Sequence, residues 1–169
     1  MPSELQIRQA TPEDAEVVAD ILNEAARWAE QAGLPLWQDG ELEPSRIVTD
    51  VNAGLFFLAE YSGESAGTVR FQLDDSDFWP DTLPQEAAYI HRLVVRRRYA
   101  GTGLSTALLR WAVERTYALG RRYLRLDCVA SRARLREIYE RFGFEHHSDR
   151  HVGPYHVSRY EYDVTKLVT

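Results

Sequence analysis

The sequence predicts one domain of the mixed α/β (α+β) class, with a central, mostly antiparallel sheet and helices on both of its faces. Three observations predict this class. Segments with a period of two residues are interleaved with segments of helical period. Two strands in the first half flank a short polar turn, as in an antiparallel hairpin. No repeat, low-complexity tract or linker divides the chain, so we expect a single domain over residues 1–169.

The first half of the chain predicts a strand, two helices and a hairpin. Thr11 and Pro12, followed by two acidic residues, have the pattern of a helix start, and apolar residues then recur at helical spacing. The polar turn Ser62–Ser65 separates the two hairpin strands. These patterns place a strand at residues 5–9, a helix from Thr11 that reaches Ala29, a short helix from about Pro44 to Asn52, and strands at 55–61 and 67–73.

The second half predicts a loop, then strand, glycine turn, helix, strand, helix and two final strands. The loop is acidic and carries two prolines, which disfavour regular structure. The predicted elements are a loop at 74–86, a strand at 88–95, a turn at 96–103, a helix with its buried face from Leu104 to Ala112, a strand at 123–129, a helix ending at Gly143, and strands at 144–148 and 155–163.

Composition excludes several classes of protein. The longest apolar run, residues 55–59, is too short for a membrane span, and the first ten residues have no apolar signal core. The net charge of −6 argues against a polyanion-binding protein. The single cysteine, Cys128, cannot form an internal disulfide. We therefore expect a cytoplasmic protein with no nucleic-acid or membrane partner; the sequence leaves open whether it is a monomer or a homodimer.

Arginine supplies 19 of the 20 basic residues, and Lys166 is the only lysine. The arginines cluster at 92–98, 121–125 and 132–141. Guanidinium groups suit phosphate recognition, whereas codon bias explains the same pattern without a ligand. A third interpretation, nucleic-acid binding through these clusters, would predict an affinity that falls steeply with salt.

The glycine turn is the strongest chemical signal. Gly101 and Gly103 let the backbone approach a ligand, and the unpaired N–H groups of the helix opening near Thr102–Thr106 favour an anion such as phosphate. A tight turn without a ligand is the alternative. A Walker loop is excluded because Lys166 lies far away, and a dinucleotide fingerprint is incomplete because Thr106 replaces its last glycine.

Two other patterns have simpler interpretations. The segment Gly63–Gly67 matches GxSxG, but a strand follows it where a nucleophile elbow needs a helix, so Ser65 is predicted to be a turn residue. The region 146–156 holds four of the five histidines, yet no metal-binding spacing is present, and we expect loop and strand histidines and no metal cofactor.

Two motifs in order resemble a known family. The segments LVVRRRYAGTGLSTALLRWA (93–112) and YLRLDCVASRARLREIYERFGFE (123–145) are similar to the acetyl-CoA-binding half of the GCN5-related N-acetyltransferases, a resemblance that covers about residues 88–145. It implies that the chain moves an acetyl group from acetyl-CoA to a primary amine of a small molecule, peptide or protein in a ternary complex. The alternative is a non-catalytic acyl-CoA sensor of the same fold.

The resemblance also implies site residues. The family's Q/R-x-x-G-x-G/A motif fits in two frames, one starting at Arg98 and one at Ala100. Arg132 stands where similar enzymes have an asparagine, and Tyr139 of YERFGF resembles the general acid that protonates the leaving thiolate. The implied cofactor-binding residues are Leu93, Val94, Val95, Arg98, Ala100, Gly101, Thr102, Gly103, Leu104, Ser105, Thr106 and Arg132.

Acetyl transfer needs a base and an oxyanion site. His91 alternates with Tyr89, Leu93 and Val95 on its strand and, with an ordinary pKa of about 6.5, can accept a proton from the amine. Glu86 is the reserve base, and a purely structural role for His91 is the alternative. Backbone N–H groups along Leu93–Val95 would hold the thioester oxygen.

The segments outside the resemblance would select the acceptor. They include Trp28, Leu34 and Trp37, and the acidic loop around Asp74–Asp81 with Trp79. Acids beside an aromatic ring can receive a cationic amine. A solvated loop without a ligand is the alternative.

Overall fold

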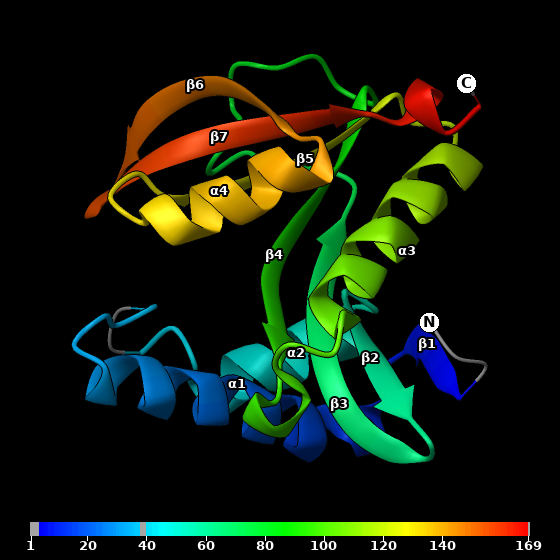
Figure 1. Ribbon diagram of the computed structural model, residues 1–169, viewed down its shortest axis with the longest axis vertical. Helices are drawn as coiled ribbons and strands as arrows, with labels where there is room; N and C mark the ends of the chain where they lie inside the picture. The colour runs from blue at the N-terminus through cyan, green and yellow to red at the C-terminus, as the bar shows by residue number, and fades with distance from the viewer. Residues whose placement is uncertain (1–3, 38–39, 169) are drawn as a thin grey trace. The chain divides into compact units, whose positions relative to one another are not determined.

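A computed structural model describes residues 4–37 and 40–168, and its elements follow the predicted order (Figure 1). Residues 38 and 39, between the first two helices, lie outside the described part. The elements are β1 (Leu5–Gln9), η1 (Pro12–Asp14), α1 (Ala15–Gln31), α2 (Pro44–Asn52), β2 (Phe56–Tyr61), β3 (Glu64–Gln72), β4 (Ala87–Val95), η2 (Arg97–Tyr99), α3 (Leu104–Ala118), β5 (Tyr123–Val129), α4 (Ala133–Phe142), β6 (Glu145–Val152), β7 (Tyr155–Asp163) and η3 (Val164–Val168).

The seven strands form one sheet in the order β1-β2-β3-β4-β5-β7-β6. The pairs β1·β2, β2·β3, β5·β7 and β6·β7 are antiparallel. The pair β4·β5 is parallel, with Ala87–Tyr89 opposite Tyr123–Arg125. The predicted mixed, mostly antiparallel sheet is therefore confirmed. Among the described residues, no helix is long and apolar enough to span a membrane.

The chain divides into two compact units. The first unit comprises residues 1–70 and 92–108, and the second comprises residues 71–91 and 109–169. The boundary in β4 falls between His91 and Arg92. Arg92 has a φ of +53°, which interrupts the extended backbone directly after His91. The two-residue alternation predicted from Tyr89 to Val95 is therefore broken in the middle of the strand.

In the first unit, α1 begins at the predicted signal. The Thr11 N–H donates to Asp14 Oδ2 at 2.8 Å, and Arg8 donates to both oxygens of that carboxylate at 2.7 and 3.0 Å. The apolar face of α1 is buried as its period predicts, except that Trp28 is 46% exposed. The core of this unit comprises Ala10, Val18, Ile21, Leu22, Ile47, Val51, Phe56, Leu58 and Val94.

The hairpin between β2 and β3 is tighter than predicted. Its turn consists of Ser62 and Gly63 alone, both with positive φ, which suits the twist of a two-residue hairpin. Ser65 therefore lies in β3 rather than in the turn, and the prediction of a turn residue was wrong. Its hydroxyl accepts a hydrogen bond from Arg96 Nη2 at 3.1 Å, so its neighbour is a cation and not a general base.

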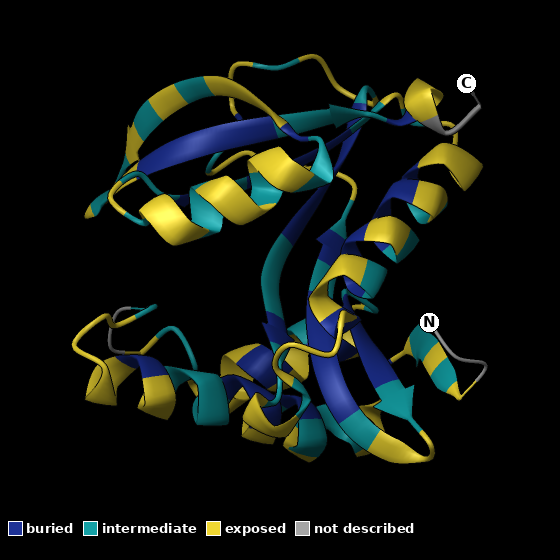
Figure 2. Cartoon of the chain, in the orientation of Figure 1, coloured by how far each residue is buried: buried dark blue, intermediate teal, exposed yellow. Residues whose placement is uncertain are grey.

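In the second unit, β7 lies between β5 and β6, and its residues Val157–Tyr160 are buried, whereas no residue of β6 is (Figure 2). Residues of β6 and α4 are mainly exposed or half-buried. The predicted end of α4 is confirmed: Gly143 has a φ of +123°, where L-residues are disfavoured. The segment 73–86 has no helix or strand, in agreement with the predicted loop.

Candidate functional site

In the first unit, the glycine turn leads directly into α3. Gly101 and Gly103 have φ values of +77° and +86°, conformations in which a glycine is preferred. The amide of Thr102 donates to Tyr99 O at 3.3 Å, and that of Ala107 donates to Gly103 O at 3.0 Å. Within the described residues, no backbone acceptor is recorded for the amides of Leu104, Ser105 and Thr106. These N–H groups at a helix start fit an anion such as a phosphate.

The other predicted cofactor residues of the first unit lie next to this turn in the chain. Leu93, Val94 and Val95 end β4, and the turn residues Ala100 and Thr102 follow η2. The backbone here is closely packed, because a Cβ on Gly67 of β3 would lie 2.7 Å from the carbonyl oxygen of Val94. The absence of a side chain at Gly67 therefore lets β3 approach the end of β4, which precedes the turn, this closely.

The arginines before the turn already have protein partners. Arg96 donates to Asp20 at 2.9 Å and Glu24 at 2.7 Å, so it fastens α1 to the end of β4. Arg97 stacks 4.0 Å from the ring centroid of Trp28. Arg98 lies on the surface, 3.0 Å from Glu64. Of these three guanidinium groups, Arg98 is therefore the one with the weakest tie to the protein, since exposed ion pairs contribute little.

In the second unit, two buried arginines hold the acidic loop. Arg159 donates to both oxygens of Asp81 at 2.7 and 3.0 Å. The guanidinium groups of Arg159 and Arg125 lie 4.5 and 5.1 Å from the ring of Trp79, which is itself buried. Because protein cations already contact this indole, the expectation that Trp79 receives a substrate amine was wrong. Trp79 has a structural role.

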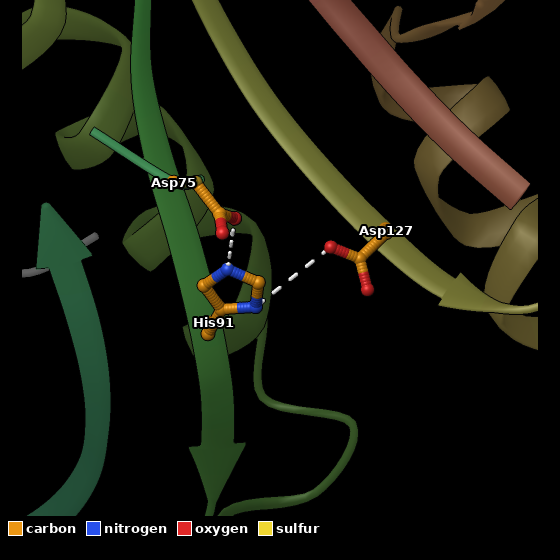
Figure 3. Close-up of side chains that lie close together, drawn as sticks. All are labelled: Asp75, His91 and Asp127. Atoms are coloured by element: carbon orange, nitrogen blue, oxygen red, sulfur yellow. Dashed lines mark hydrogen bonds and ion pairs between the residues drawn. The ribbon is translucent and has the colours of Figure 1, made fainter. Parts of the chain in front are cut away.

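Asp75, at the start of this loop, orients His91. Nε2 of His91 lies 2.6 Å from Asp75 Oδ2 (Figure 3). The other oxygen, Oδ1, accepts the backbone N–H of Phe78 at 3.1 Å, and the Phe78 ring lies 5.3 Å from the imidazole. Both carboxylate oxygens are thus acceptors, which assigns the Nε2 proton to the hydrogen bond with Asp75. The sequence did not single out Asp75 within its acidic loop.

Asp127 of β5 lies on the other side of the imidazole. Its Oδ2 is 3.8 Å from His91 Nδ1, too far for a hydrogen bond (Figure 3). Burial raises the pKa of Asp127 to about 6; the nearby Asp75 also raises it, whereas His91 and Arg159 lower it. Sequence reasoning missed this residue. The available signal was a carboxylate inside the apolar strand YLRLDCV, between Leu126 and Cys128, which are both buried.

Glu86, the reserve base, is hydrogen-bonded to a buried arginine. Its Oε2 accepts a hydrogen bond from the buried Arg125 guanidinium at 3.0 Å, and Glu161 accepts a second one at 2.8 Å. Two carboxylates therefore neutralise one buried cation. This arrangement favours His91 over Glu86 as the base.

Tyr139 lies on α4, with its ring 6.0 Å from that of Phe144 and 6.3 Å from that of Tyr160. Burial raises the pKa of its hydroxyl well above its ordinary value, with smaller contributions from Cys128 and Asp127. The hydroxyl therefore keeps its proton at neutral pH, as a general acid must. Arg132 is the N-cap residue of α4, and its backbone N–H donates to Val129 O at 2.9 Å.

The histidines of β6 and β7 pair with their neighbours. His146 lies 2.9 Å from Asp149, and the rings of His151 and His156 stack at 4.4 Å. Within residues 4–37 and 40–168, the group of three side chains close enough to share a metal ion is Asp75, His91 and Asp127, with donor atoms within 4.8 Å of one another. The 2.6 Å separation of His91 and Asp75 is shorter than the roughly 3 Å expected between two ligands of one ion.

The sheet order and the glycine turn before α3 agree with the acyl-CoA-dependent N-acetyltransferases that the sequence motifs resemble. The model of the Acetyltransferase (GNAT) family matches residues 18–144, and the chain belongs to this family. It is 33% identical over 143 residues to the uncharacterized N-acetyltransferase YesJ of Bacillus subtilis, covering 80% of this chain and 79% of the relative.

Solved structures agree with this membership. A GNAT-family acetyltransferase from Listeria monocytogenes is 26% identical and superposes with a TM-score of 0.79 over 94% of this chain and 95% of its own. YncA of Salmonella typhimurium, described as an acetyltransferase and solved with its cofactor acetyl-CoA, is 15% identical, with a TM-score of 0.70 over 96% of this chain and 95% of its own. The second likeness concerns the fold alone. The resemblance stated from the sequence motifs is confirmed.

Proposed function

We propose that the protein, as a single domain over residues 1–169, transfers the acetyl group of acetyl-CoA to a primary amine by direct attack in a ternary complex. The acceptor is a small molecule or an amine of a peptide or protein. Membership of the acetyltransferase family supports the reaction class. The acetyl-CoA that accompanies the Salmonella protein supports the choice of donor.

The observation that carries this proposal is the row of backbone N–H groups at the start of α3. Two glycines with positive φ lead the chain into a helix of 15 residues, and the amides of Leu104–Thr106 have no backbone acceptor within the described part of the chain. Phosphate oxygens are the natural acceptors for such amides. We assign the pyrophosphate of acetyl-CoA to this turn, with Ala100–Thr106 around it and Arg98 as a cation beside it in the chain. Arg132, at the start of α4 in the second unit, stays a separate predicted contact of the cofactor.

The residues of the second unit supply the proton transfers. His91 Nδ1 takes one proton from the ammonium group, and the imidazolium that forms is stabilised by Asp75 at Nε2. The neutral nitrogen attacks the thioester carbon, so a C–N bond forms and the C–S bond breaks. Tyr139 gives its hydroxyl proton to the leaving thiolate and regains one through water from the new amide nitrogen. The backbone amides of Leu93–Val95 hold the carbonyl oxygen as charge develops on it.

An acceptor screen tests the proposal. Purified protein is mixed with acetyl-CoA and a panel of small primary amines, polyamines, amino acids and peptides, and released thiol is measured with a thiol reagent. We expect release with at least one amine and a matching acetylated product by mass spectrometry. Binding of acetyl-CoA by calorimetry without thiol release from any amine would favour the acyl-CoA sensor, and absence of binding would contradict both functions.

Location and partners stay predictions. The charge balance and the single buried Cys128 favour a cytoplasmic protein without nucleic-acid or membrane partners. Homodimer formation is decided by light scattering on the purified protein.

A further inference from the structure

The cluster of Asp75, His91 and Asp127 holds two carboxylates around one imidazole. All three side chains belong to the second unit, and they are 4%, 16% and 9% exposed, respectively. Even with His91 protonated, two ionised carboxylates would leave one negative charge without a cation within the cluster. The positive charge of Arg159 lowers the pKa of Asp127, but both terminal nitrogens of the Arg159 guanidinium are hydrogen-bonded to Asp81. A buried charge of this kind favours the binding of a cation or a proton.

The hydrogen bonds of Asp75 determine what faces Asp127. Because Oδ1 accepts the Phe78 N–H and Oδ2 lies 2.6 Å from Nε2, the imidazole proton lies on the Asp75 side. Neutral His91 then presents the lone pair of Nδ1 to Oδ2 of Asp127, 3.8 Å away. Two acceptors facing each other at this distance repel unless a hydrogen donor lies between them.

The oxygen on the Asp127 side is unsatisfied. Among the described residues, Oδ2 of Asp127 is buried and has no hydrogen-bond partner, although the side chain is nine-tenths buried. Figure 3 shows this carboxylate directed at the imidazole. Buried carboxylate oxygens without a donor are rare in folded proteins, and at such positions a water molecule, an ion or a ligand completes the hydrogen bonding.

A primary ammonium group has the positive charge and the N–H donors that could satisfy both His91 Nδ1 and Asp127 Oδ2. A nitrogen about 2.9 Å from each of the two acceptors would subtend an angle of about 80° between them, so both hydrogen bonds bend only modestly from the tetrahedral N–H directions. A –NH3⁺ group has three donors and one positive charge. A hydroxyl has one donor and a quaternary ammonium has none, so neither satisfies both acceptors.

We propose that His91 Nδ1 and Asp127 Oδ2 form a two-point subsite for the primary ammonium group of the acceptor. This inference rests on the amine acetyltransferase activity proposed above, and it adds Asp127 as the residue that holds the nitrogen. One N–H of the ammonium donates to each atom. When the proton on the Nδ1 side moves to His91, the neutral amine keeps its hydrogen bond to Asp127, and its freed lone pair can attack.

The subsite is tested on the full-length protein with ¹⁵N-labelled histidine, using His91→Gln to assign the His91 resonances. The probes are n-propylammonium chloride and tetramethylammonium chloride, which carry the same charge but differ in N–H donors. We expect n-propylammonium to shift the His91 Nδ1 resonance with saturation and tetramethylammonium to leave it unchanged. Asp127→Asn should weaken n-propylammonium binding about tenfold or more, because a charge-assisted hydrogen bond is lost.

Asp77→Asn is the matched control, since it removes one carboxylate from an exposed position of the same loop. It should bind n-propylammonium as the wild type does. Equal responses to the two cations, or unchanged binding in Asp127→Asn, would overturn the subsite. Zinc chloride provides a third arm: displacement of n-propylammonium by zinc at an Asp127-dependent site of much higher affinity would show a metal site instead.

The kinetic counterpart separates this inference from the function on which it rests. With an amine found in the acceptor screen, Asp127→Asn should raise KM for the amine about tenfold or more while KM for acetyl-CoA stays unchanged. If no amine is acetylated, the proposed function fails, but the resonance titration still decides whether the ammonium subsite exists. If turnover is seen and the amine KM of Asp127→Asn is unchanged, only the subsite fails.

Discussion

Arg159 and Asp81 form a bidentate ion pair, with the two terminal nitrogens of the guanidinium 2.7 and 3.0 Å from the two carboxylate oxygens. The arginine side chain is 3% exposed, whereas that of Asp81 is 47% exposed. Arg159 also donates to the carbonyl of Phe78 and stacks on Trp79, so a single residue of β7 contacts three residues of the loop. The position of Asp75, and through it that of His91, therefore depends on contacts made several residues further along the chain.

Replacing Asp81 with asparagine should destabilise the protein by about 2 kcal/mol at pH 7. The loss leaves a buried guanidinium without its counter-ion, and it falls below the roughly 3–5 kcal/mol of fully buried pairs because the carboxylate is half exposed. The hydrogen bonds from Arg159 hold the pKa of Asp81 well below its usual range, so the stabilisation is present above pH 4 and is lost in acid. Urea unfolding at pH 7 and pH 3 measures this, with Asp77→Asn expected to leave stability unchanged.

Asp127→Asn should have the opposite effect on stability. Burial raises the pKa of Asp127 to about 6, so the folded state binds a proton more readily than the unfolded state between pH 4 and pH 6. Wild-type stability therefore falls as pH rises through this window. A neutral asparagine avoids that cost, and we expect the variant to be about 2 kcal/mol more stable at pH 7.5 and equal to wild type at pH 4. A less stable variant at pH 7.5 would show that this carboxylate is a satisfied structural group.

Asp75→Asn should lower kcat for the best amine about 100-fold. The asparagine no longer fixes the Nε2 proton, so His91 shifts to the tautomer that presents N–H instead of a lone pair at Nδ1. Histidine ¹⁵N chemical shifts report the tautomer directly, and KM for acetyl-CoA should not change. His91→Gln should reduce kcat to a similar extent, and the double variant should lose little more; additive losses would contradict a shared role.

Tyr139→Phe should slow turnover about 100-fold without changing the affinity for acetyl-CoA, because a general acid contributes to leaving-group departure and not to binding. A matched experiment uses an aryl acetyl thioester, whose thiolate leaves without a proton. With that donor, the variant and the wild type should react at similar rates. An equal deficit with both donors would assign Tyr139 to packing of α4 rather than to acid catalysis.

Gly67→Ala should destabilise the first unit by about 2 kcal/mol, because its Cβ would lie 2.7 Å from the Val94 carbonyl oxygen and the backbone must move. Gly103→Ala is the comparison: its Cβ would meet nothing within 4 Å, but the positive φ costs about 1 kcal/mol. Chemical unfolding of both variants distinguishes the two causes. A larger loss for Gly103→Ala would contradict the close approach at Gly67.

Local patterns predicted most of the fold. The short helix predicted from about Pro44 to Asn52 has the observed bounds Pro44–Asn52. The sequence also singled out His91 and the glycine turn as candidates, because each is marked by residue type within one strand or one turn. The two-residue turn at Ser62–Gly63 was missed because Glu64 and Ser65 are polar, although both belong to β3.

The remainder depends on contacts between distant segments. Asp75 and Asp127 are separated by 52 positions in the chain, and nothing local to either shows that one imidazole lies between them. The sequence suggested that Trp79 binds a ligand cation. The two arginines that contact its ring come from β5 and β7, far from Trp79 in the chain, so no local pattern reveals them. Such pairings follow from the order of strands, which periodicity alone does not specify.

Because the loop is held at only some of its residues, other positions in it can be substituted freely. The anchors lie from Phe78 to Asp81, whereas Ser76 and Asp77 are exposed and lie between these anchors and Asp75. Evolution, or a designer, can therefore vary those two positions while the imidazole keeps its orientation and the domain keeps its resistance to unfolding.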